Sequence, residues 1–431
     1  MSATTQERVP APDEVVELRH VTVVSRKVPV VLTVVTVLFA LLLALAPREG
    51  DARFRLASPN DFVALPELVV PGTAAAWVCV AVMAVLTVLA YVRVGTRRKV
   101  PLWVSGLFAV VFLVGFLAWA AAGSPNDIPA VRVIGGSVLL AVPIVFGALG
   151  GVIGERAGVV NIAIEGQLLA GAFCAAVVGS ATGSPWAGLL AAVAAGVLVA
   201  AVLGAFTITY KVNQVIVGVV LNVLVIGVTS FLYSQVLVPN AALNSTTRFS
   251  NIAIPGLSQI PVIGPSLFNQ TVVVYLMYLA VPAVWFAMYR TRWGLRTRAV
   301  GEHPKAADTV GIKVERTRYR ALLVAGAITG VGGAFYTVVS VSAFGKEMTA
   351  GAGFIALAAV IFGKWDPVKA ALAALLFGFA SNLEGALSIV GAPVPSQFML
   401  MLPYVVTILA VAGLVGRSRA PAASGQPYVK E

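Results

Sequence analysis

The sequence predicts an all-α, polytopic membrane protein, with about nine transmembrane helices in a core and about three more in an N-terminal extension. Of the 431 residues, 59% are hydrophobic and only 11% are charged, whereas an average soluble protein carries about 25% charged residues. Long apolar stretches recur along the chain and are apolar on every face, which is typical of helices that contact lipid.

The first span is predicted at residues 28–46, after a polar segment of residues 1–27. A cleaved signal peptide is the competing interpretation, but the leader is long and partly acidic, so we favour an uncleaved anchor. Three spans fall within residues 28–130, which form the extension. All spans after the first are predicted at residues 73–92, 101–122, 133–153, 162–182, 186–209, 214–237, 271–289, 321–342, 353–363, 367–389 and 398–416.

Two stretches are expected to be interrupted. Residues 353–363 are too few for a full crossing, and the Gly-rich residues 147–158 are expected to break their helix. Non-helical backbone at membrane depth is tolerated only where it is buried in protein or lines a cavity, so interrupted helices often mark a transport path. Packing kinks are the alternative. A weak similarity between the segments that start at Gly166 and Gly353 predicts an inverted repeat.

The net charge of +12 is distributed over the junctions between apolar stretches. This distribution argues against nucleic-acid binding and follows the positive-inside rule, which places the N-terminal tail (residues 1–27) and the C-terminal tail (residues 417–431) in the cytoplasm. The chain has two histidines, His20 and His303, and two cysteines, Cys79 and Cys174. Their spacing predicts neither a metal site nor a catalytic site.

Residues 147–171 place ionisable and amide groups among apolar and glycine residues: Glu155, Arg156, Asn161, Glu165 and Gln167. Such groups are costly within a membrane and usually mark a substrate path. Asn161 and Glu165 are four residues apart, so a continuous helix would place them on one face. We predict that Asn161, Glu165 and Gln167 line the path. In the alternative, Glu155 and Arg156 form a turn and Glu165 bonds the backbone of a neighbouring helix.

Two further regions are candidates for contacts with solute or its carrier. Asn213, Gln214 and Asn222 begin another span and are predicted to line the path, with interhelical hydrogen bonding as the alternative. The loop at residues 238–270 has Arg248 as its only charge and is predicted to lie outside the cell. It either receives a solute-binding protein or forms an ordered outer cap.

The loop at residues 290–320 contains nine basic and three acidic residues, so it is expected to be cytoplasmic. Pro304 suits the first position of a helix and Gly311 suits its end, which predicts a short helix between two spans. The alternative is a basic loop that fixes topology and touches anionic lipid.

Several segments carry a family resemblance. The run ERAGVVNIAIEGQLLAGAF, from Glu155, resembles the signature of permease subunits of bacterial ABC importers for nucleosides and simple sugars, which are related to ribose and branched-chain amino acid permeases. KVNQVIVGVVLNVLVIGVTSFLY from Lys211, TRWGLRTRAVGEHPKAADTVGI from Thr291 and MTAGAGFIALAAVIFGKWDP from Met348 are similar to the same group. The resemblance covers roughly residues 135–416. It implies a permease core at residues 131–416, located in the bacterial plasma membrane.

The resemblance also implies roles for two sets of residues. A structural or gating role is implied for Glu155, Arg156, Gly158 and Gly166. The short helix in the 290–320 loop resembles the coupling helix that docks into an ATPase subunit, which implies coupling roles for Gly301, Glu302, His303, Pro304, Ala307, Asp308 and Gly311. The family usually has Asn where this chain has His303, and Asn is the better cap.

No GxxxxGK[ST] phosphate loop occurs in the sequence. The resemblance therefore implies that a partner ATPase subunit uses ATP and Mg, and that this chain is not an enzyme and binds no cofactor. It further implies a second, related permease in a heterodimer, an extracellular solute-binding lipoprotein and surrounding membrane lipid. The expected function is import of nucleosides, or simple sugars such as ribose, by alternating access. An ion-gradient-driven secondary transporter and a membrane-embedded transferase are the alternatives.

Overall fold

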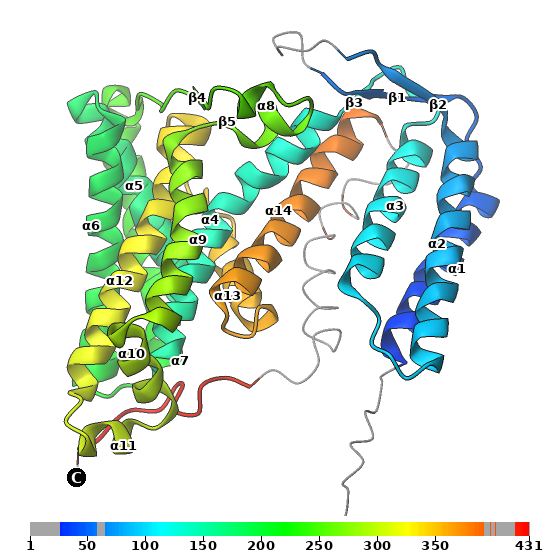
Figure 1. Ribbon diagram of the computed structural model, residues 1–431. Helices are drawn as coiled ribbons and strands as arrows, with labels where there is room; N and C mark the ends of the chain where they lie inside the picture. Colours follow the sequence, from blue (N-terminus) through cyan, green and yellow to red (C-terminus); the bar gives the residue numbers. More distant parts are fainter. Residues whose placement is uncertain (1–25, 58–64, 392–396, 398–400, 402–418, 431) are drawn as a thin grey trace, which may run out of the picture. The chain divides into compact units, whose positions relative to one another are not determined.

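A computed structural model describes residues 26–57, 65–391, 397, 401 and 419–430. Among these residues, ten helices are long and apolar enough to cross a membrane, which confirms the prediction of a polytopic, mainly helical membrane protein (Figure 1). The predicted span at residues 398–416 lies outside the described residues. The chain divides into two compact units, residues 1–52 with 70–124 and residues 53–69 with 125–431.

The described residues of the first unit form three helices: α1 (Lys27–Leu45), α2 (Gly72–Gly95) and α3 (Leu102–Ala121). α2 packs against both α1 and α3. Phe39 of α1 lies edge-on to Phe112 of α3, with their ring centroids 5.3 Å apart, and a Cβ added at Gly115 would overlap Cys79 of α2. These helices correspond to the first three predicted spans.

Short strands connect the helices and do not alter the helical class. β1 (Asp51–Arg55), β2 (Leu68–Pro71) and β3 (Ile128–Pro129) form a sheet in the order β2-β1-β3. β1 and β3 are parallel, with Phe54 opposite Ile128. β4 (Ile252–Ala253) and β5 (Asn269–Gln270) form an antiparallel pair in a long loop of the second unit.

The second unit is built around α4 (Ala130–Arg156) and α12 (Val314–Phe335). α4 packs against α12, α13 (Ala352–Phe362) and α14 (Pro367–Ile389), and it is the most extensively buried of the described spans. α12 continues into the π-helical segment η5 (Tyr336–Val341). Small residues allow these helices to approach closely, as is common where helices associate in membranes.

Three helices cover one side of this centre. α5 (Ile164–Thr182) packs against α6 (Pro185–Gly204) and α12, and α7 (Gln214–Leu232) packs against α5. α6 and α7 end in the π-helical segments η1 (Ala205–Thr209) and η2 (Tyr233–Leu237). A Cβ added at Gly196 of α6 would overlap the backbone of Gly326 and Gly330 in α12, so this contact requires glycine.

The loops of the second unit lie at opposite ends of its bundle (Figure 1). The loop between α7 and α9 (Val272–Arg290) contains η3 (Ala241–Asn244), β4, η4 (Leu257–Gln259), α8 (Ile263–Leu267) and β5. At the opposite end, α10 (Arg292–Glu302) and α11 (Pro304–Thr309) connect α9 to α12. We call these two ends of the second unit the β4 end and the α11 end.

The predicted interruptions fall partly where expected. α13 has 11 residues, or about 16 Å at 1.5 Å per residue, which is too short to cross a hydrocarbon core of about 30 Å. The prediction that residues 147–158 break their helix is wrong, because α4 continues to Arg156. The glycines of this stretch instead make room for neighbours: a Cβ at Gly150 would overlap Thr329, and a Cβ at Gly151 would overlap Val360.

Candidate functional site

The turn between α4 and α5, residues 157–163, is held by amide side chains from α7. Asn222 Oδ1 accepts a hydrogen bond from the backbone N–H of Gly166 at 2.8 Å, and its Nδ2 donates to the carbonyl oxygen of Ile162 at 2.9 Å. Gln214 Oε1 accepts from the backbone N–H of Val160 at 2.6 Å. Because buried backbone groups are costly when unpaired, these amides stabilise the non-helical turn within the bundle.

Glu165 connects the first turn of α5 to the beginning of α13. Its Oε1 accepts hydrogen bonds from Thr349 Oγ1 at 2.6 Å and from the backbone N–H of Gly351 at 2.9 Å. Its Oε2 accepts from the backbone N–H of Gly353 at 2.6 Å. A carboxylate at a helix N-terminus satisfies N–H groups that lack intrahelical partners and favours the helix dipole. We call these four residues the Glu165 clasp.

The clasp leaves no room for a larger residue at position 353. A Cβ added at Gly353 would overlap the backbone N and Cα of Glu165, so the N-terminal ends of α5 and α13 are in direct backbone contact. Glu165 is 5% exposed. The short α13 is therefore attached at its first residues to the helix that follows the 157–163 turn.

Asn161 and Gln167 form a second pair beside the turn. Asn161 Nδ2 donates to Gln167 Oε1 at 3.1 Å, and both residues are fully buried. Among the described residues, Asn161 Oδ1 and Gln167 Nε2 have no hydrogen-bond partner. The pair therefore retains one buried acceptor and one buried donor.

Two local expectations about the polar residues change. Asn161 and Glu165 do not share a helix face, because α5 begins at Ile164 and Asn161 precedes it in the turn. Asn213 is the N-cap of α7, and its Oδ1 accepts from Val215 N–H at 2.9 Å and from Ile216 N–H at 3.3 Å. Roles of Asn161, Glu165, Gln167, Asn213 and Asn222 in a substrate path stay predictions.

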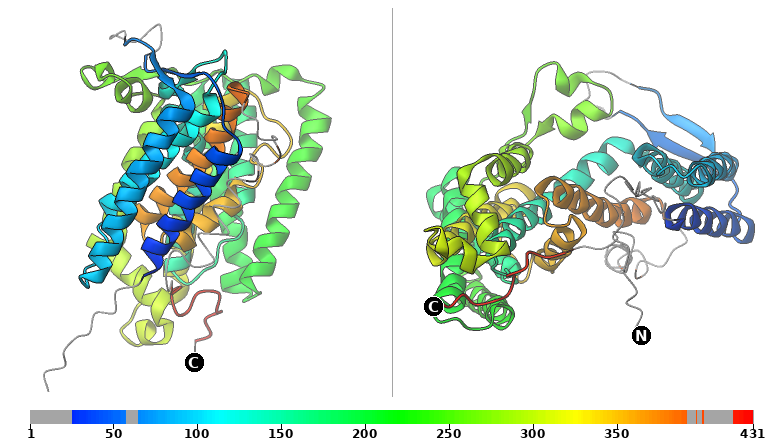
Figure 2. Two further views of the ribbon diagram at one scale, coloured as in Figure 1. Left: turned by 90° about the vertical axis from the view of Figure 1, so that its right-hand side faces the viewer. Right: turned by 60° about the horizontal axis from the view of Figure 1, so that its bottom comes forward.

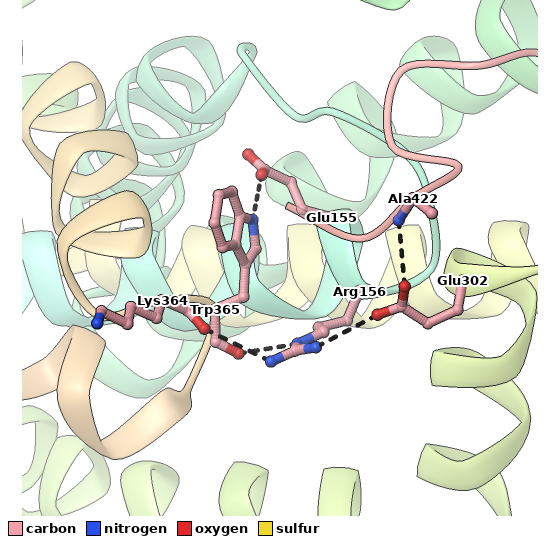
Figure 3. A network of polar contacts seen from close by, with 6 residues as sticks. All are labelled: Glu155, Arg156, Glu302, Lys364, Trp365 and Ala422. Carbon is pink, nitrogen blue, oxygen red and sulfur yellow. Dashed lines mark hydrogen bonds and ion pairs between the residues drawn. The ribbon is translucent and has the colours of Figure 1, made fainter. Parts of the chain in front are cut away.

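A second polar cluster lies at the α11 end, where α4 meets the turn between α13 and α14 (Figure 3). We call Glu155, Arg156, Glu302, Lys364 and Trp365 the polar hub. Glu155 is buried, and its Oε2 accepts a hydrogen bond from the indole N–H of Trp365. The indole therefore satisfies a buried carboxyl oxygen near the end of α4.

Arg156, the last residue of α4, connects three segments of the hub (Figure 3). Its Nε donates to the carbonyl oxygen of Trp365 at 3.0 Å, and its Nη2 donates to that of Lys364 at 3.5 Å. Its Nη1 lies 3.8 Å from Glu302 Oε1, at the end of α10. Arg156 thus links the membrane helix α4 to both the α13–α14 turn and the α10–α11 segment.

α11 has the predicted helical form, whereas the helix α10 that precedes it was not predicted from the sequence. Pro304 is the first residue of α11, and Gly311, with φ +83°, follows the helix closely. His303 is the N-cap, and its side chain makes no capping hydrogen bond, consistent with the weaker capping expected of His. Ala307 is buried, and Asp308 Oδ2 lies 3.8 Å from Lys430 Nζ.

Three glycines allow close approach around these clusters. A Cβ at Gly301 would overlap the carbonyl of Arg156, and a Cβ at Gly166 would lie 3.1 Å from Asn222 Oδ1. Gly158 has φ +86°, in the left-handed region that favours glycine. A structural reason thus favours glycine at all three positions: Gly158 in the 157–163 turn, Gly166 in α5 beside α7, and Gly301 where α10 meets the end of α4.

Sequence reasoning did not assign the partners of the buried carboxylates. Trp365 and Thr349 lie in segments that were recognised only as stretches of family resemblance, and each contacts a carboxylate about 200 residues earlier in the chain. The sequence signal that could have indicated a packed turn is Trp365, which follows the short apolar helix α13 and directly precedes Asp366 and Pro367.

The β4 end contains a cavity with a volume of about 740 Å³. Its wall includes Arg132 of α4, Arg248 and Asn251 of the long loop, and Asn382 of α14. Arg248 Nη1 donates to the carbonyl oxygen of Ser340 at 3.2 Å. Among the described residues, no group of three or more His, Cys, Asp or Glu side chains is placed to hold a metal ion.

Comparison with known proteins decides the family. The model of the family described as branched-chain amino acid transport system, permease component, matches residues 133–411, which is well over half of the chain. The chain belongs to this permease family. The match includes the Glu165 clasp and all five residues of the polar hub, and it starts within α4.

Curated relatives of the permease are subunits of ABC transporters. The guanosine ABC transporter permease protein NupQ of Bacillus subtilis is 40% identical over 307 residues, covering 69% of this chain and 96% of the relative. The nucleoside ABC transporter permease protein NupC of Lactococcus lactis is 36% identical over 311 residues, covering 69% and 96%. The putative glucose ABC transporter permease protein TsgC13 of Haloferax volcanii is 34% identical over 329 residues, covering 70% and 98%. No solved structure matches the chain.

These comparisons fix the function in outline. The chain is a membrane-spanning permease subunit of an ABC importer, and its relatives are transporter subunits, not enzymes. Membership in this family implies ATPase and solute-binding-protein partners in general. Nothing in the comparisons supports an ion-gradient-driven transporter or a transferase.

Proposed function

We propose that this permease imports nucleosides and that ATP hydrolysis in a partner subunit drives the transport. The single observation that supports coupling between ATP hydrolysis and transport is the contact between Arg156 and Glu302. This contact joins α4 to the segment that ends in α11. Two relatives whose names specify guanosine or nucleosides support the substrate class, since the chain covers 96% of each.

Force from the ATPase subunit would enter the permease at α11. α11 is short and lies at one end of the bundle (Figure 1), with Val310 at its end 74% exposed. A push on α11 would act on Glu302, then on Arg156 and the α13–α14 turn, because these groups are bonded in series. Gly301 adds a direct backbone contact with Arg156, so displacement does not depend on the ion pair alone.

The same displacement would reach the proposed substrate path through α4 and α13. The 157–163 turn follows directly from Arg156, and the Glu165 clasp attaches α5 to the start of α13. Asn161 and Gln167 keep a free acceptor and a free donor in this region. A nucleoside offers complementary donors and acceptors on its base and ribose, so separation of these helices would expose groups suited to bind it.

The basic loop at residues 290–320 favours one orientation of the permease in the membrane, and this orientation indicates on which side each partner would bind. The α11 end, with its nine basic residues at 290–320, would face the cytoplasm, together with both tails. The β4 end would face outward and receive a solute-binding lipoprotein. A second, related permease would complete the pathway as a heterodimer. The alternative substrate class is simple sugars, which the glucose-permease relative supports.

Uptake in proteoliposomes tests this proposal. The permease would be reconstituted with a candidate ATPase, second permease and binding protein from the same organism, and uptake of labelled guanosine, ribose and glucose would be compared. We expect guanosine uptake that requires enclosed ATP and persists when an ionophore collapses ion gradients. Uptake that needs no ATP, or that is specific for ribose or glucose, would contradict the ATP-driven nucleoside assignment.

A further inference from the structure

Residues 419–430 form an irregular segment with a turn at residues 422–425, here called the strap, which lies against the α11 end of the second unit (Figure 2). The family match ends at residue 411, so the strap lies beyond the part of the chain that the family model describes. Within the strap, Pro421 and Ala423 are buried, and Gly425 takes a φ of +79°. The strap is therefore packed against the protein and is not a solvent-exposed tail.

The strap binds the end of α10 through two backbone N–H groups. Ala423 N–H donates to the carbonyl oxygen of Gly301 at 2.9 Å, and Ala422 N–H donates to Glu302 Oε2 at 3.2 Å (Figure 3). Oε1 of the same carboxylate lies 3.8 Å from Arg156 Nη1. Glu302 is therefore held between α4 and the strap, one oxygen on each.

The strap also contacts the beginning of α12 and the turn after α4. Arg318 of α12 is 1% exposed, and its Nη1 donates to the carbonyl oxygen of Gln426 at 3.0 Å. A Cβ at Gly158 would lie 2.9 Å from Arg318 Nη2 and 3.2 Å from the carbonyl oxygen of Ala423. Because a buried charge without a partner is strongly destabilising, the strap carbonyl matters for this guanidinium.

Its last residues reach α11. Tyr428 packs against a small apolar cluster formed by Val300 of α10, Ala307 of α11 and Val314 of α12. Lys430 Nζ lies 3.8 Å from Asp308 Oδ2 on α11. The strap thus contacts the three consecutive helices of the loop that the proposed function assigns to coupling.

We infer that the strap is a positioning element that fixes α11 relative to the ends of α4 and α12. The inference rests on the proposed function, in which α11 meets the ATPase subunit. α11 has only six residues and is joined to α10 and α12 by short turns, so by itself it would yield locally when pushed. Attachment of the strap to α10, α11, α12 and the 157–163 turn makes these parts move together, and the push reaches α4.

A pair of matched variants tests the inference in the full transporter. Ala423→Leu adds bulk at a buried position that contacts Gly301, whereas Ala422→Leu adds the same bulk at the exposed neighbouring position. Overpacking a close contact typically raises the free energy of the packed state, and the equilibrium constant for forming that contact then falls by about fivefold or more. We expect Ala423→Leu to lower guanosine uptake per ATP hydrolysed by about fivefold or more, with co-purification of the ATPase retained. Uptake per ATP equal to that of Ala422→Leu and wild type would overturn the inference.

A cross-link covers the case in which Ala423→Leu fails to fold. Asp308→Cys and Lys430→Cys would be joined by a short bifunctional thiol reagent, in a background without Cys79 and Cys174. A positioning element stays on α11 throughout the cycle, so the cross-linked transporter should keep its uptake per ATP. Loss of transport that reduction of a cleavable reagent restores would show that the strap must leave α11, which contradicts the inference.

A third variant separates this inference from the proposed function. Val310→Asp alters an exposed residue at the end of α11 that has no assigned contact with the strap. Uptake that needs no ATP, in both the wild type and Val310→Asp, would remove the proposed function itself. Loss of coupling in Val310→Asp with normal coupling in Ala423→Leu would remove only the strap inference.

Discussion

Glu165 Oε2 accepts a hydrogen bond from the backbone N–H of Gly353 at 2.6 Å, so a carboxylate in the first turn of α5 caps the beginning of α13. The two residues are 188 positions apart in the chain. α13 is too short to cross the membrane by itself, and this contact fixes its first turn. The clasp thus joins the start of α5, directly after the 157–163 turn, to the non-helical chain that leads into α13.

Glu165→Ala should strongly reduce uptake while membrane insertion stays intact. Removal of the carboxylate leaves up to three buried donors without an acceptor, at about 1–3 kcal/mol for each donor that water cannot reach. Uptake of labelled guanosine and the thermal unfolding temperature in detergent would be measured together. Glu165→Gln, which retains one carbonyl acceptor, should lie between Ala and wild type. Wild-type uptake by Glu165→Ala would remove Glu165 from the transport mechanism.

Gly353→Ala should destabilise the protein, because its methyl group would overlap the backbone of Glu165. Overpacking of this kind typically costs about 1–3 kcal/mol. Gly345→Ala is the matched control in the same segment, since a Cβ there meets no atom within 4 Å. Thermal unfolding in detergent should show a lower midpoint for Gly353→Ala only, and equal midpoints for the two variants would argue against the close packing of α5 on α13.

Trp365→Phe should weaken the hub by removing the indole N–H that Glu155 accepts. The expected cost is about 1–3 kcal/mol, because Glu155 is buried and would lose this partner. A double-mutant cycle with Glu155→Leu measures the interaction itself. In the Trp365→Phe background, Glu155→Leu removes a carboxyl that has already lost its partner. Glu155→Leu should therefore destabilise the protein less in that background than in the wild type. Strictly additive effects on the unfolding midpoint would show that the two side chains do not interact.

The sequence predicts the spans well because the thickness of the bilayer sets the same minimum length of apolar helix for each of them. Every described span except α13 satisfies that length requirement, and the short α13 was recognised by the same rule. Pro304 and Gly311 likewise predict α11 correctly, because each acts through its own backbone conformation. These features depend on local properties of the chain.

Features that depend on distant contacts were not accessible from one sequence. Gly150 and Gly151 look like helix breakers, but they pack α4 against Thr329 and Val360, so the helix continues. The donors to Glu165 come from a segment more than 180 residues later in the chain. Residues 417–431 combine four charged residues with several small ones, and nothing in their pattern indicates that Ala423 would bind the end of α10.

The contact between Arg156 and Glu302 is expected to matter far more for coupling than for stability. Glu302 is about half exposed, and an ion pair of this kind contributes only about 0–1 kcal/mol to folding. Its position between α4 and α10 nevertheless places it on the proposed route of force. Glu302→Gln retains an acceptor for Ala422 N–H, whereas Glu302→Arg places two cations side by side.

The number of ATP molecules hydrolysed per guanosine imported, measured in proteoliposomes for wild type, Glu302→Gln and Glu302→Arg, tests the coupling route most directly. We predict a ratio that rises slightly in Glu302→Gln and several-fold in Glu302→Arg, with the ATPase still bound. An unchanged ratio and undiminished uptake in Glu302→Arg would contradict transmission of force from α11 to α4 through this pair.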